Sequence, residues 1–305
     1  MKKIKLIFRL ARLHFLVLGF LLYLLGYILA LLEGIEFDLT KFLFGYLVFG
    51  TAHLSVSFSN DYFDRHSDRK SVKTHFSGGS KVLVEHPELE YFAVSFAVFL
   101  LVISAVFCVL FIIIYNYSLW FFVFVLLGGL LGWFYSSTPI KLAYRGLGEI
   151  STMLGVGFFM TGMGYFVGSG VLGSLLLLFS LPLSFYGLFF IISVELPDVE
   201  CDILGNKKNI TTIFGIKSGK LISFAAVLSG TIYFLVMLYL KISNNLIDWT
   251  PIFIFSFLPL FASIISILWN NKNRKTLVKQ VMLNMGSLTT FVILIIVSLF
   301  LQITP

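Results

Sequence analysis

The sequence predicts an all-α, polytopic membrane protein with nine transmembrane helices. Of its 305 residues, 58% are hydrophobic and only 12% are charged, and the mean hydropathy is +0.98. A water-soluble domain of this length could not bury so much apolar surface, whereas a bilayer accommodates it. Apolar stretches of about 20 residues, the length that crosses a hydrocarbon core of roughly 30 Å, recur between short polar segments.

The nine predicted spans belong to one domain that covers residues 1–305. They cover residues 12–32, 39–59, 92–115, 118–134, 147–169, 173–194, 220–240, 250–269 and 282–302. The first apolar run exceeds the hydrophobic region of a signal peptide and has no convincing cleavage site, so we expect it to be retained as a span.

The basic residues predict the orientation of these spans. Twenty of the 22 Lys and Arg fall on one side, which leaves Lys41 and Lys241 on the other. The positive-inside rule then places the N-terminus and the segments 60–91, 135–147 and 195–219 in the cytoplasm, and the C-terminus outside. The net charge of +7 is therefore a topology signal with some attraction to anionic lipid, not a nucleic-acid-binding surface. The expected location is a cytoplasmic membrane of bacterial or archaeal type.

An acidic cluster follows the second span. The sequence reads Asn60-Asp61-Tyr62-Phe63-Asp64, with Asp68 one helical turn further on. At about 100° per helical residue, Asp61, Asp64 and Asp68 lie within roughly 60° of one another, so their carboxylates are expected to converge.

A second cluster with the same i, i+3, i+7 spacing, Glu195, Asp198 and Asp202, ends the sixth span. Because the clusters end the second and sixth spans, spans one to four and five to eight are interpreted as two similar four-helix halves, with the ninth helix added. Pro197 should kink the sixth span, and this kink either aims Asp198 and Asp202 inward or ends the helix.

The ligand chemistry of the clusters favours Mg²⁺. Neighbouring carboxylates repel one another unless a cation neutralises them, and ligand sets made only of oxygen suit hard cations. Since Mg²⁺ usually binds one or two carboxylates together with substrate phosphates, two facing clusters predict a diphosphate site. The histidines form no metal-ligand spacing, and His53, in the middle of a span, is interpreted as hydrogen-bonded packing.

Other interpretations of these features remain. Each acidic cluster alone could be a solvated helix end. Arg12, the Gly78–Lys81 stretch, and the i, i+4 pair Lys141 and Arg145 could bind phosphate or could lie at the headgroup level. A cation transporter would need polar residues near mid-span, whereas both clusters lie at cytoplasmic ends, which favours an enzyme.

With these features the chain resembles the UbiA superfamily of intramembrane prenyltransferases over nearly its whole length. The motifs that carry the resemblance are Asn60-Asp61-x-x-Asp64-x-x-x-Asp68, Tyr135-Ser136 through Pro139 to Lys141, and Asp198-x-x-x-Asp202 followed by Gly205, Lys207, Lys208 and Thr212. The resemblance implies Mg²⁺-dependent transfer of a polyprenyl group from an allylic diphosphate donor to an aromatic acceptor, with membrane lipids around it. No nucleic acid and no obligatory protein partner is implied.

The resemblance also implies roles for individual residues. Asp61, Asp64, Asp198 and Asp202 would be catalytic and, with Asp68, would bind Mg²⁺. The diphosphate would be bound by Asn60, Lys81, Lys141, Arg145 and Arg12. The isoprenoid tail would lie between helices and open sideways to lipid.

Within the superfamily, the segments 142–149 and 195–202 look most like the branch that prenylates 1,4-dihydroxy-2-naphthoate on the way to menaquinone. Three departures leave other acceptors open, namely 4-hydroxybenzoate, a haem or a glycerol-phosphate lipid. Ser136-Ser137-Thr138 stands where that branch often has Gly-Gly before Pro139, Leu13 follows Arg12 where Pro is common, and Glu195 occupies a place often filled by Asn.

Overall fold

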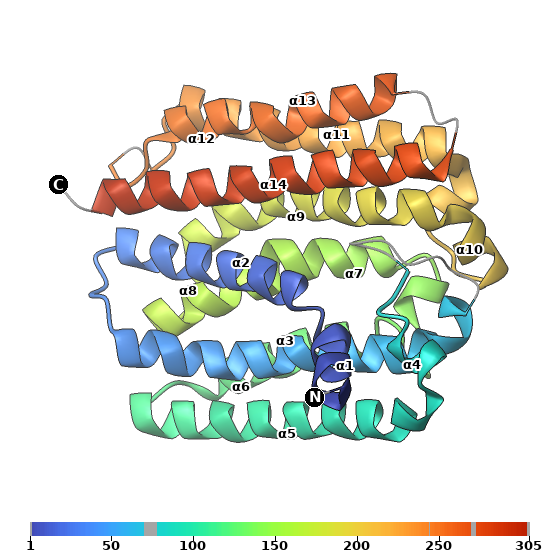
Figure 1. The fold of residues 1–305 in the computed structure, drawn as a ribbon. Coiled ribbons are helices and arrows are strands. Elements are labelled where there is room, and N and C mark those ends of the chain that lie inside the picture. Colours follow the sequence, from blue (N-terminus) through green and yellow to red (C-terminus); the bar gives the residue numbers. More distant parts are fainter. Residues whose placement is uncertain (1, 70–77, 244, 270–272, 304–305) are drawn as a thin grey trace.

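The computed structural model describes residues 2–69, 78–243, 245–269 and 273–303, and every regular element in these ranges is a helix (Figure 1). Residues 70–77 of the predicted site segment 60–91 therefore lie outside the described residues. The long helices are α2 (Leu13–Leu32), α3 (Leu39–Asp68), α5 (Glu90–Tyr115), α9 (Ser174–Glu195), α11 (Ile210–Leu240) and α14 (Arg274–Ile303). The all-helical fold class is confirmed.

The remaining elements are shorter. They are α1 (Lys2–Ala11), α4 (Val82–Glu85), α6 (Leu119–Trp133), α7 (Gly148–Leu154), α8 (Thr161–Ser169), α10 (Val199–Leu204), α12 (Trp249–Phe255) and α13 (Phe257–Leu268), with single turns η1 (Pro87–Leu89), η2 (Leu142–Tyr144) and η4 (Leu196–Asp198) and a π-helical segment η3 (Gly155–Met160). The predicted span 147–169 is thus α7, η3 and α8 in succession.

Eight helical segments in the described ranges are long and apolar enough to cross a membrane, which makes this an integral multi-pass membrane protein. They are Leu13–Leu32, Leu39–Asp68, Pro87–Tyr115, Gly148–Ser169, Ser174–Leu204, Ile210–Leu240, Trp249–Leu268 and Arg274–Ile303. The predicted span 118–134 corresponds to α6, whose 15 residues extend only about 22 Å. The count of nine and the two similar halves stay predictions.

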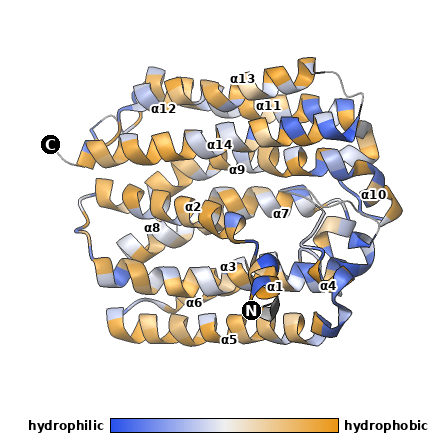
Figure 2. Ribbon diagram, viewed as in Figure 1, coloured by the Kyte–Doolittle hydropathy of each residue, from blue (hydrophilic) through white to orange (hydrophobic). Residues whose placement is uncertain are grey.

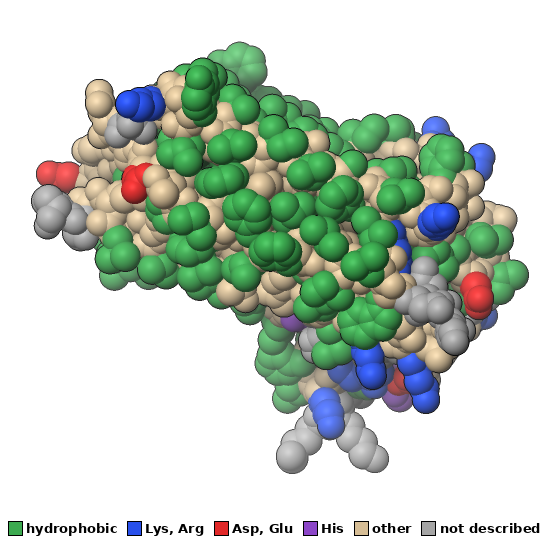
Figure 3. All heavy atoms as spheres, turned by 90° about the horizontal axis from the view of Figure 1, so that it is seen from above, with side chains coloured by type: hydrophobic (Ala, Val, Ile, Leu, Met, Phe, Trp, Pro, Cys, Tyr) green, Lys and Arg blue, Asp and Glu red, His purple; other side chains and the backbone are tan. Residues whose placement is uncertain are grey.

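The long helices lie side by side along one direction (Figure 1). Hydrophilic residues gather at the end of the bundle that holds α4 and α10, and the C-terminus lies at the opposite end (Figure 2). Hydrophobic side chains cover the middle of the face seen in Figure 3, and charged side chains lie toward its ends. The polar end is therefore where a charged ligand can be bound without crossing the apolar part of the bundle.

Two helix boundaries position the acidic clusters. Helix α3 continues to Asp68, beyond the predicted end at residue 59, so the first cluster lies on the helix itself. At Pro197 the chain leaves α9, forms the single turn η4 and continues as α10. This break ends α9 and separates Glu195 from Asp202 by a change of helix, so the second cluster does not continue one regular helical face.

The walls of the bundle depend on close contact between α2 and α8. A Cβ atom added at Gly26 would lie 1.7 Å from the backbone oxygen of Thr161, and one added at Gly164 would lie 1.8 Å from that of Tyr23. Glycine at both positions lets the two backbones touch, as small residues commonly do between membrane helices.

Gly26→Ala should therefore force α2 away from α8 and lower the free energy of unfolding by about 2 kcal/mol, the usual cost of overpacking. The thermal unfolding midpoint of the purified protein in detergent measures this effect. Gly286→Ala on α14 is the matched control, because no atom lies within 4 Å of its added Cβ. Equal midpoints for the two variants would contradict the importance of the α2–α8 contact.

Candidate active site

A cavity of about 410 Å³ lies inside the bundle and is lined by residues of α2, α3, α6, α7, η3, α8, α9 and α14 and of the polar segments at their ends. Asp64 and Asp68 of the first cluster line it together with Asp198 and Asp202 of the second. The structure thus brings the two clusters, far apart in the sequence, to the same cavity. Glu195 lines it as well.

Asp64 is the most heavily bonded carboxylate of the first cluster. Tyr144 donates a hydrogen bond of 2.7 Å to its Oδ1, and Ser136 donates one of 2.9 Å to its Oδ2. The ammonium of Lys207 lies 3.2 Å from Oδ2. These donors come from the segment 135–147 and from the loop after α10, so Asp64 connects α3 to both of these segments.

Asp61 turns toward the N-terminal helices and does not line the cavity. Its Oδ1 lies 2.7 Å from Nη2 of Arg12, and it accepts hydrogen bonds from the hydroxyl and the backbone N–H of Ser80. Because Arg12 itself lines the cavity, this pair holds a guanidinium at the cavity edge. Asn60, the next residue in the motif, lines the cavity, and its Oδ1 is buried without a hydrogen-bond partner among the described residues.

Asp68 lies against the glycine-rich segment. Gly79 has a φ of +69°, and a Cβ added there would lie 2.0 Å from Oδ2 of Asp68. Glycine is therefore required both by the backbone conformation and by the close approach of the carboxylate. Lys81 donates to the backbone oxygen of Asp68 and is not among the residues that line the cavity.

The second cluster has its own polar partners. Arg274 of α14 lies 3.0 Å from Oδ1 of Asp198 and donates to the backbone oxygen of Pro197 at 2.9 Å. Asn209 donates a 2.9 Å hydrogen bond to Oδ2 of Asp202. Glu195 is 8% exposed, and its Oε2 is buried with no partner in the described ranges.

Lys207 supplies positive charge between the clusters. Burial alone would lower the pKa of its ammonium, but the nearby carboxylates of Asp64 and Asp202 outweigh that effect and raise its pKa well above the ordinary lysine value. Burial and the Asp64 carboxylate likewise raise the pKa of Tyr144, so this phenol stays protonated and donates. The polar end therefore holds a fixed cation and fixed donors around Asp64.

The carboxylates of the two clusters can supply part of the ligand set of a Mg²⁺ ion. Asp61, Asp64, Asp68 and Asp198 are each at most 8% exposed, and the carboxylates that line the charged end of the cavity offer oxygen ligands. However, no group of three His, Cys, Asp or Glu in the described part of the chain could hold a metal ion, so the expected convergence of Asp61, Asp64 and Asp68 is not observed. One or two carboxylates from each cluster fit Mg²⁺, whose remaining ligands are normally water and phosphate oxygens.

Several predicted diphosphate contacts lie away from the cavity lining. The guanidinium of Arg145 is exposed and donates to the backbone oxygen of Pro139 at 3.0 Å. The ammonium of Lys141 lies 5.2 Å from the ring centroid of Tyr144. Of the basic residues predicted to contact diphosphate, Arg12 alone is among the cavity-lining residues described.

Five polar residues that contact the acidic side chains were not selected from the sequence, namely Ser136, Tyr144, Lys207, Asn209 and Arg274. Ser136 and Lys207 did stand in the motifs that carried the family resemblance, so a signal for them existed. Arg274 had none, because it comes from the start of the last helix, 76 residues from Asp198.

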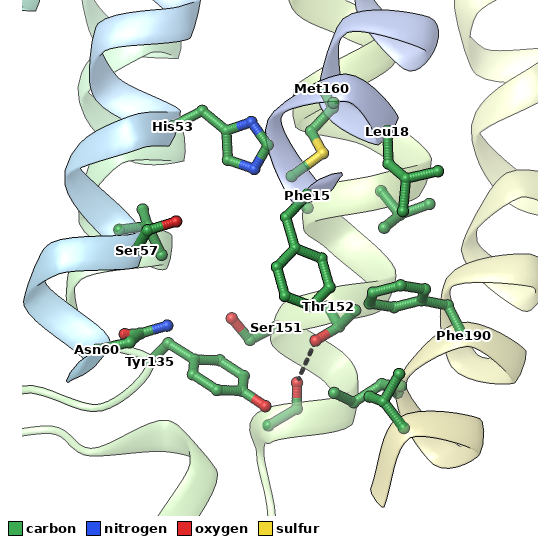
Figure 4. A pocket seen from close by; sticks show the side chains of 18 of the residues that line it. Phe15, Leu18, His53, Ser57, Asn60, Tyr135, Ser151, Thr152, Met160 and Phe190 are labelled. Atoms are coloured by element: carbon green, nitrogen blue, oxygen red, sulfur yellow. Dashed lines mark hydrogen bonds between the residues drawn. The ribbon is translucent and has the colours of Figure 1, made fainter. Parts of the chain in front are cut away.

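The other end of the cavity is apolar and aromatic (Figure 4). Phe15 and Leu18 reach it from α2, Met160 from η3 and Phe190 from α9. The rings of Phe15 and Phe190 meet edge to face, with centroids 6.2 Å apart. The cavity thus combines a charged end with a region suited to a hydrocarbon or an aromatic ring.

Comparisons with known proteins agree with this geometry. The model of the UbiA prenyltransferase family matches residues 19–288. Solved structures share the fold. A UbiA homolog from Archaeoglobus fulgidus bound to GPP and Mg²⁺ has a TM-score of 0.65 at 17% identity, over 97% of this chain and 100% of that one.

Two further structures are similar to the same extent. The apo UbiA homolog from Aeropyrum pernix K1 has a TM-score of 0.65 at 16% identity, over 92% of this chain and 97% of its own. A structure described for digeranylgeranylglyceryl phosphate synthase has a TM-score of 0.66 at 17% identity, over 98% and 99%. A search of curated protein sequences finds no match.

Lys207→Met should destabilise the protein when divalent cations are absent, because the carboxylates of Asp64 and Asp202 lose their counter-charge. We expect the free energy of unfolding to fall by about 2 kcal/mol, less than the loss of a fully buried partner. Lys208→Met is the matched control, since Lys208 is exposed. Thermal unfolding in detergent with a chelator compares the two, and an equal loss would contradict the charge pairing.

Proposed function

This chain belongs to the UbiA prenyltransferase family, and we propose that it transfers a polyprenyl group from an allylic diphosphate to an aromatic acceptor in a Mg²⁺-dependent reaction. The observation that carries the proposal is the cavity itself. Its charged end is lined by Asp64, Asp68, Asp198 and Asp202, and its other end is apolar. A prenyl diphosphate has the same division between an anionic head and a hydrocarbon tail.

The charged end would bind the diphosphate. Carboxylates of Asp64, Asp68, Asp198 and Asp202 would hold Mg²⁺, with Asp61 held in place by Arg12 and Ser80. When bound, Mg²⁺ supplies positive charge that stabilises the departing diphosphate. The structure of a relative bound to GPP and Mg²⁺ supports this assignment.

Side chains of this chain would contribute the rest of the electrostatic stabilisation. Arg12 and Lys207 line the cavity and carry fixed positive charge toward the leaving group. Asn60 would assist through its amide. The allylic C–O bond breaks, the acceptor ring forms a C–C bond to the freed allylic carbon, and the ring then loses a proton or its carboxyl group. The aromatic walls exclude water from the allylic cation.

For the acceptor we propose 1,4-dihydroxy-2-naphthoate, which makes the product a precursor of menaquinone. The segments 142–149 and 195–202 support this choice. The likeness to the digeranylgeranylglyceryl phosphate synthase structure favours a second candidate, a glycerol-phosphate lipid. The distribution of Lys and Arg supports a cytoplasmic N-terminus and active site.

The direct test incubates the purified protein in lipid vesicles with Mg²⁺, a long allylic diphosphate and one acceptor at a time. Mass spectrometry then follows prenylated product. Product from 1,4-dihydroxy-2-naphthoate, with its carboxyl group lost, is the expected result. Product from glycerol phosphate lipid alone would keep the family chemistry and overturn the acceptor, and the absence of product and of released diphosphate would overturn the proposal.

Asp64→Asn and Asp198→Asn should each lower kcat by at least roughly 100-fold, the scale expected when a group that stabilises developing charge is lost. Each removes a proposed Mg²⁺ ligand without changing the size of the side chain, so the variants should stay folded in detergent. Glu200→Gln is the matched control, because Glu200 is exposed on α10 between the two aspartates of the second cluster. Near-normal turnover in either Asp variant would rule out the two-cluster site.

The predicted diphosphate contacts can be separated by donor affinity. Arg12→Ala should raise KM for the allylic diphosphate by roughly tenfold, the equivalent of one charge-assisted hydrogen bond. The same measurement on Lys141→Ala, Arg145→Ala and Lys81→Ala tests whether these side chains reach the diphosphate in the bound state. If KM for the allylic diphosphate is unchanged in one of these variants, that side chain does not contact the diphosphate.

A further inference from the structure

A row of polar side chains runs along α3 from the acidic cluster into the apolar part of the cavity. His53, Ser57 and Asn60 stand at i, i+4 and i+7, and Asp64 follows at i+11. At about 100° per residue these positions share one helix face. All four line the cavity, and Figure 4 shows His53, Ser57 and Asn60 in order along the helix. We call His53, Ser57 and Asn60 the polar row.

Members of the polar row are not satisfied by the protein. Nδ1 of His53 and Oδ1 of Asn60 are buried without a hydrogen-bond partner in the described ranges. The expectation that His53 is hydrogen-bonded packing is therefore wrong. Ser55 and Ser59 donate to backbone oxygens three residues earlier, the usual arrangement for serine in a membrane helix. Ser57 makes no such bond among the described residues.

The imidazole of His53 is held firmly although its nitrogen is unsatisfied. It stacks on Phe49 with ring centroids 5.3 Å apart. A Cβ added at Gly19 would lie 2.3 Å from its Cε1 and 2.4 Å from its Nδ1, so glycine on α2 makes the space that the ring occupies. The Nδ1 edge of the ring therefore faces α2, and a ligand in the cavity reaches the imidazole through its other nitrogen, Nε2, for which the described residues provide no hydrogen bond. Polar groups inside a membrane bundle are costly, and one that is held in place without a protein partner on its cavity side points to a ligand.

The prenyl chain cannot satisfy the polar row, because it is a hydrocarbon. Seven helical residues separate Asn60 from His53, which is about 10 Å along the axis. The polar row therefore extends beyond the diphosphate end to a depth where the donor has no polar atom. The other substrate does have oxygen atoms. Phe15, which lies across the cavity from Ser57 in Figure 4, offers a ring to pack against a flat aromatic molecule.

We infer that the polar row is the acceptor subsite, and that His53 and Ser57 bind a ring hydroxyl group of a hydroxylated aromatic acceptor. This inference rests on the proposed prenyl transfer and specifies where the second substrate binds. The hydroxyl group fixes the ring beside the allylic carbon, while Asn60 lies at the boundary between the acceptor and the diphosphate. A hydroxylated ring is thereby distinguished from an apolar ring of the same size.

Variants of His53 test the inference in vesicles with saturating prenyl diphosphate and Mg²⁺. His53→Leu should raise KM for 1,4-dihydroxy-2-naphthoate by roughly tenfold, since one hydrogen bond is lost, and should leave KM for the allylic diphosphate within about twofold. His53→Gln, which retains a hydrogen-bonding group, should lie closer to the wild type. The exposed His66 lies near the opposite side of the same helix, so His66→Leu is the matched control.

Acceptor analogues test the same contact through a difference in affinity between two closely related molecules, which misfolding of the variant cannot produce. The two mono-O-methyl ethers of 1,4-dihydroxy-2-naphthoate each block one hydroxyl group. In the wild type one ether should bind roughly tenfold more weakly than the parent, and in His53→Leu this difference should disappear. The loss of discrimination would tie His53 to that hydroxyl group.

The possible failures are distinguishable. If the wild type prenylates no aromatic acceptor, the proposed function fails. If it prenylates the naphthoate and His53→Leu keeps the wild-type KM and the same discrimination between ethers, only the acceptor subsite fails. If His53→Leu raises KM for donor and acceptor equally, His53 shapes the cavity and does not bind the acceptor, which also overturns the inference.

Discussion

The structure depends on the need to neutralise carboxylates that are buried at the edge of a membrane bundle. Asp61 and Asp64 are 3% and 8% exposed, and a buried charge is costly unless a counter-charge and hydrogen bonds surround it. Arg12 reaches Asp61 from the start of α2, and Lys207 reaches Asp64 from the loop after α10. The same requirement that holds these helix ends together leaves a strongly charged pocket, which a metal ion and a diphosphate can complete.

In the middle of the bundle the described residues present no charges to neutralise, and the helices are held together by close packing. Gly26 and Gly164 bring α2 and α8 into backbone contact, and Gly19 leaves room for a ring between α2 and α3. Helix α2 therefore has two functions. Its start carries Arg12 to the acidic cluster, and its packing along α8 and α3 shapes the cavity wall. A change in its position would alter the charged end and the apolar end together.

How far the sequence predicted this arrangement depends on the range of the interactions. The spacing of Asp61, Asp64 and Asp68 follows from one helix, so the shared face could be predicted, but their separate partners could not. Those partners come from distant segments, as Arg274 does for Asp198. Periodicity also could not show that α6 is too short for a full span, because the apolar run looks continuous while the helix ends at Trp133.

Local sequence was least informative where a polar side chain stays unsatisfied. A histidine in the middle of an apolar span is usually paired, and the pattern around His53 gave no reason to expect otherwise. Only the three-dimensional arrangement shows that its Nδ1 lacks a partner while Ser55 and Ser59 are bonded to their own backbone. An enzyme that joins two substrates must leave polar groups open for both. The charged end meets this need for the donor, and by the same reasoning an uncharged row deeper in the cavity meets it for an acceptor whose oxygens must be bound without a metal.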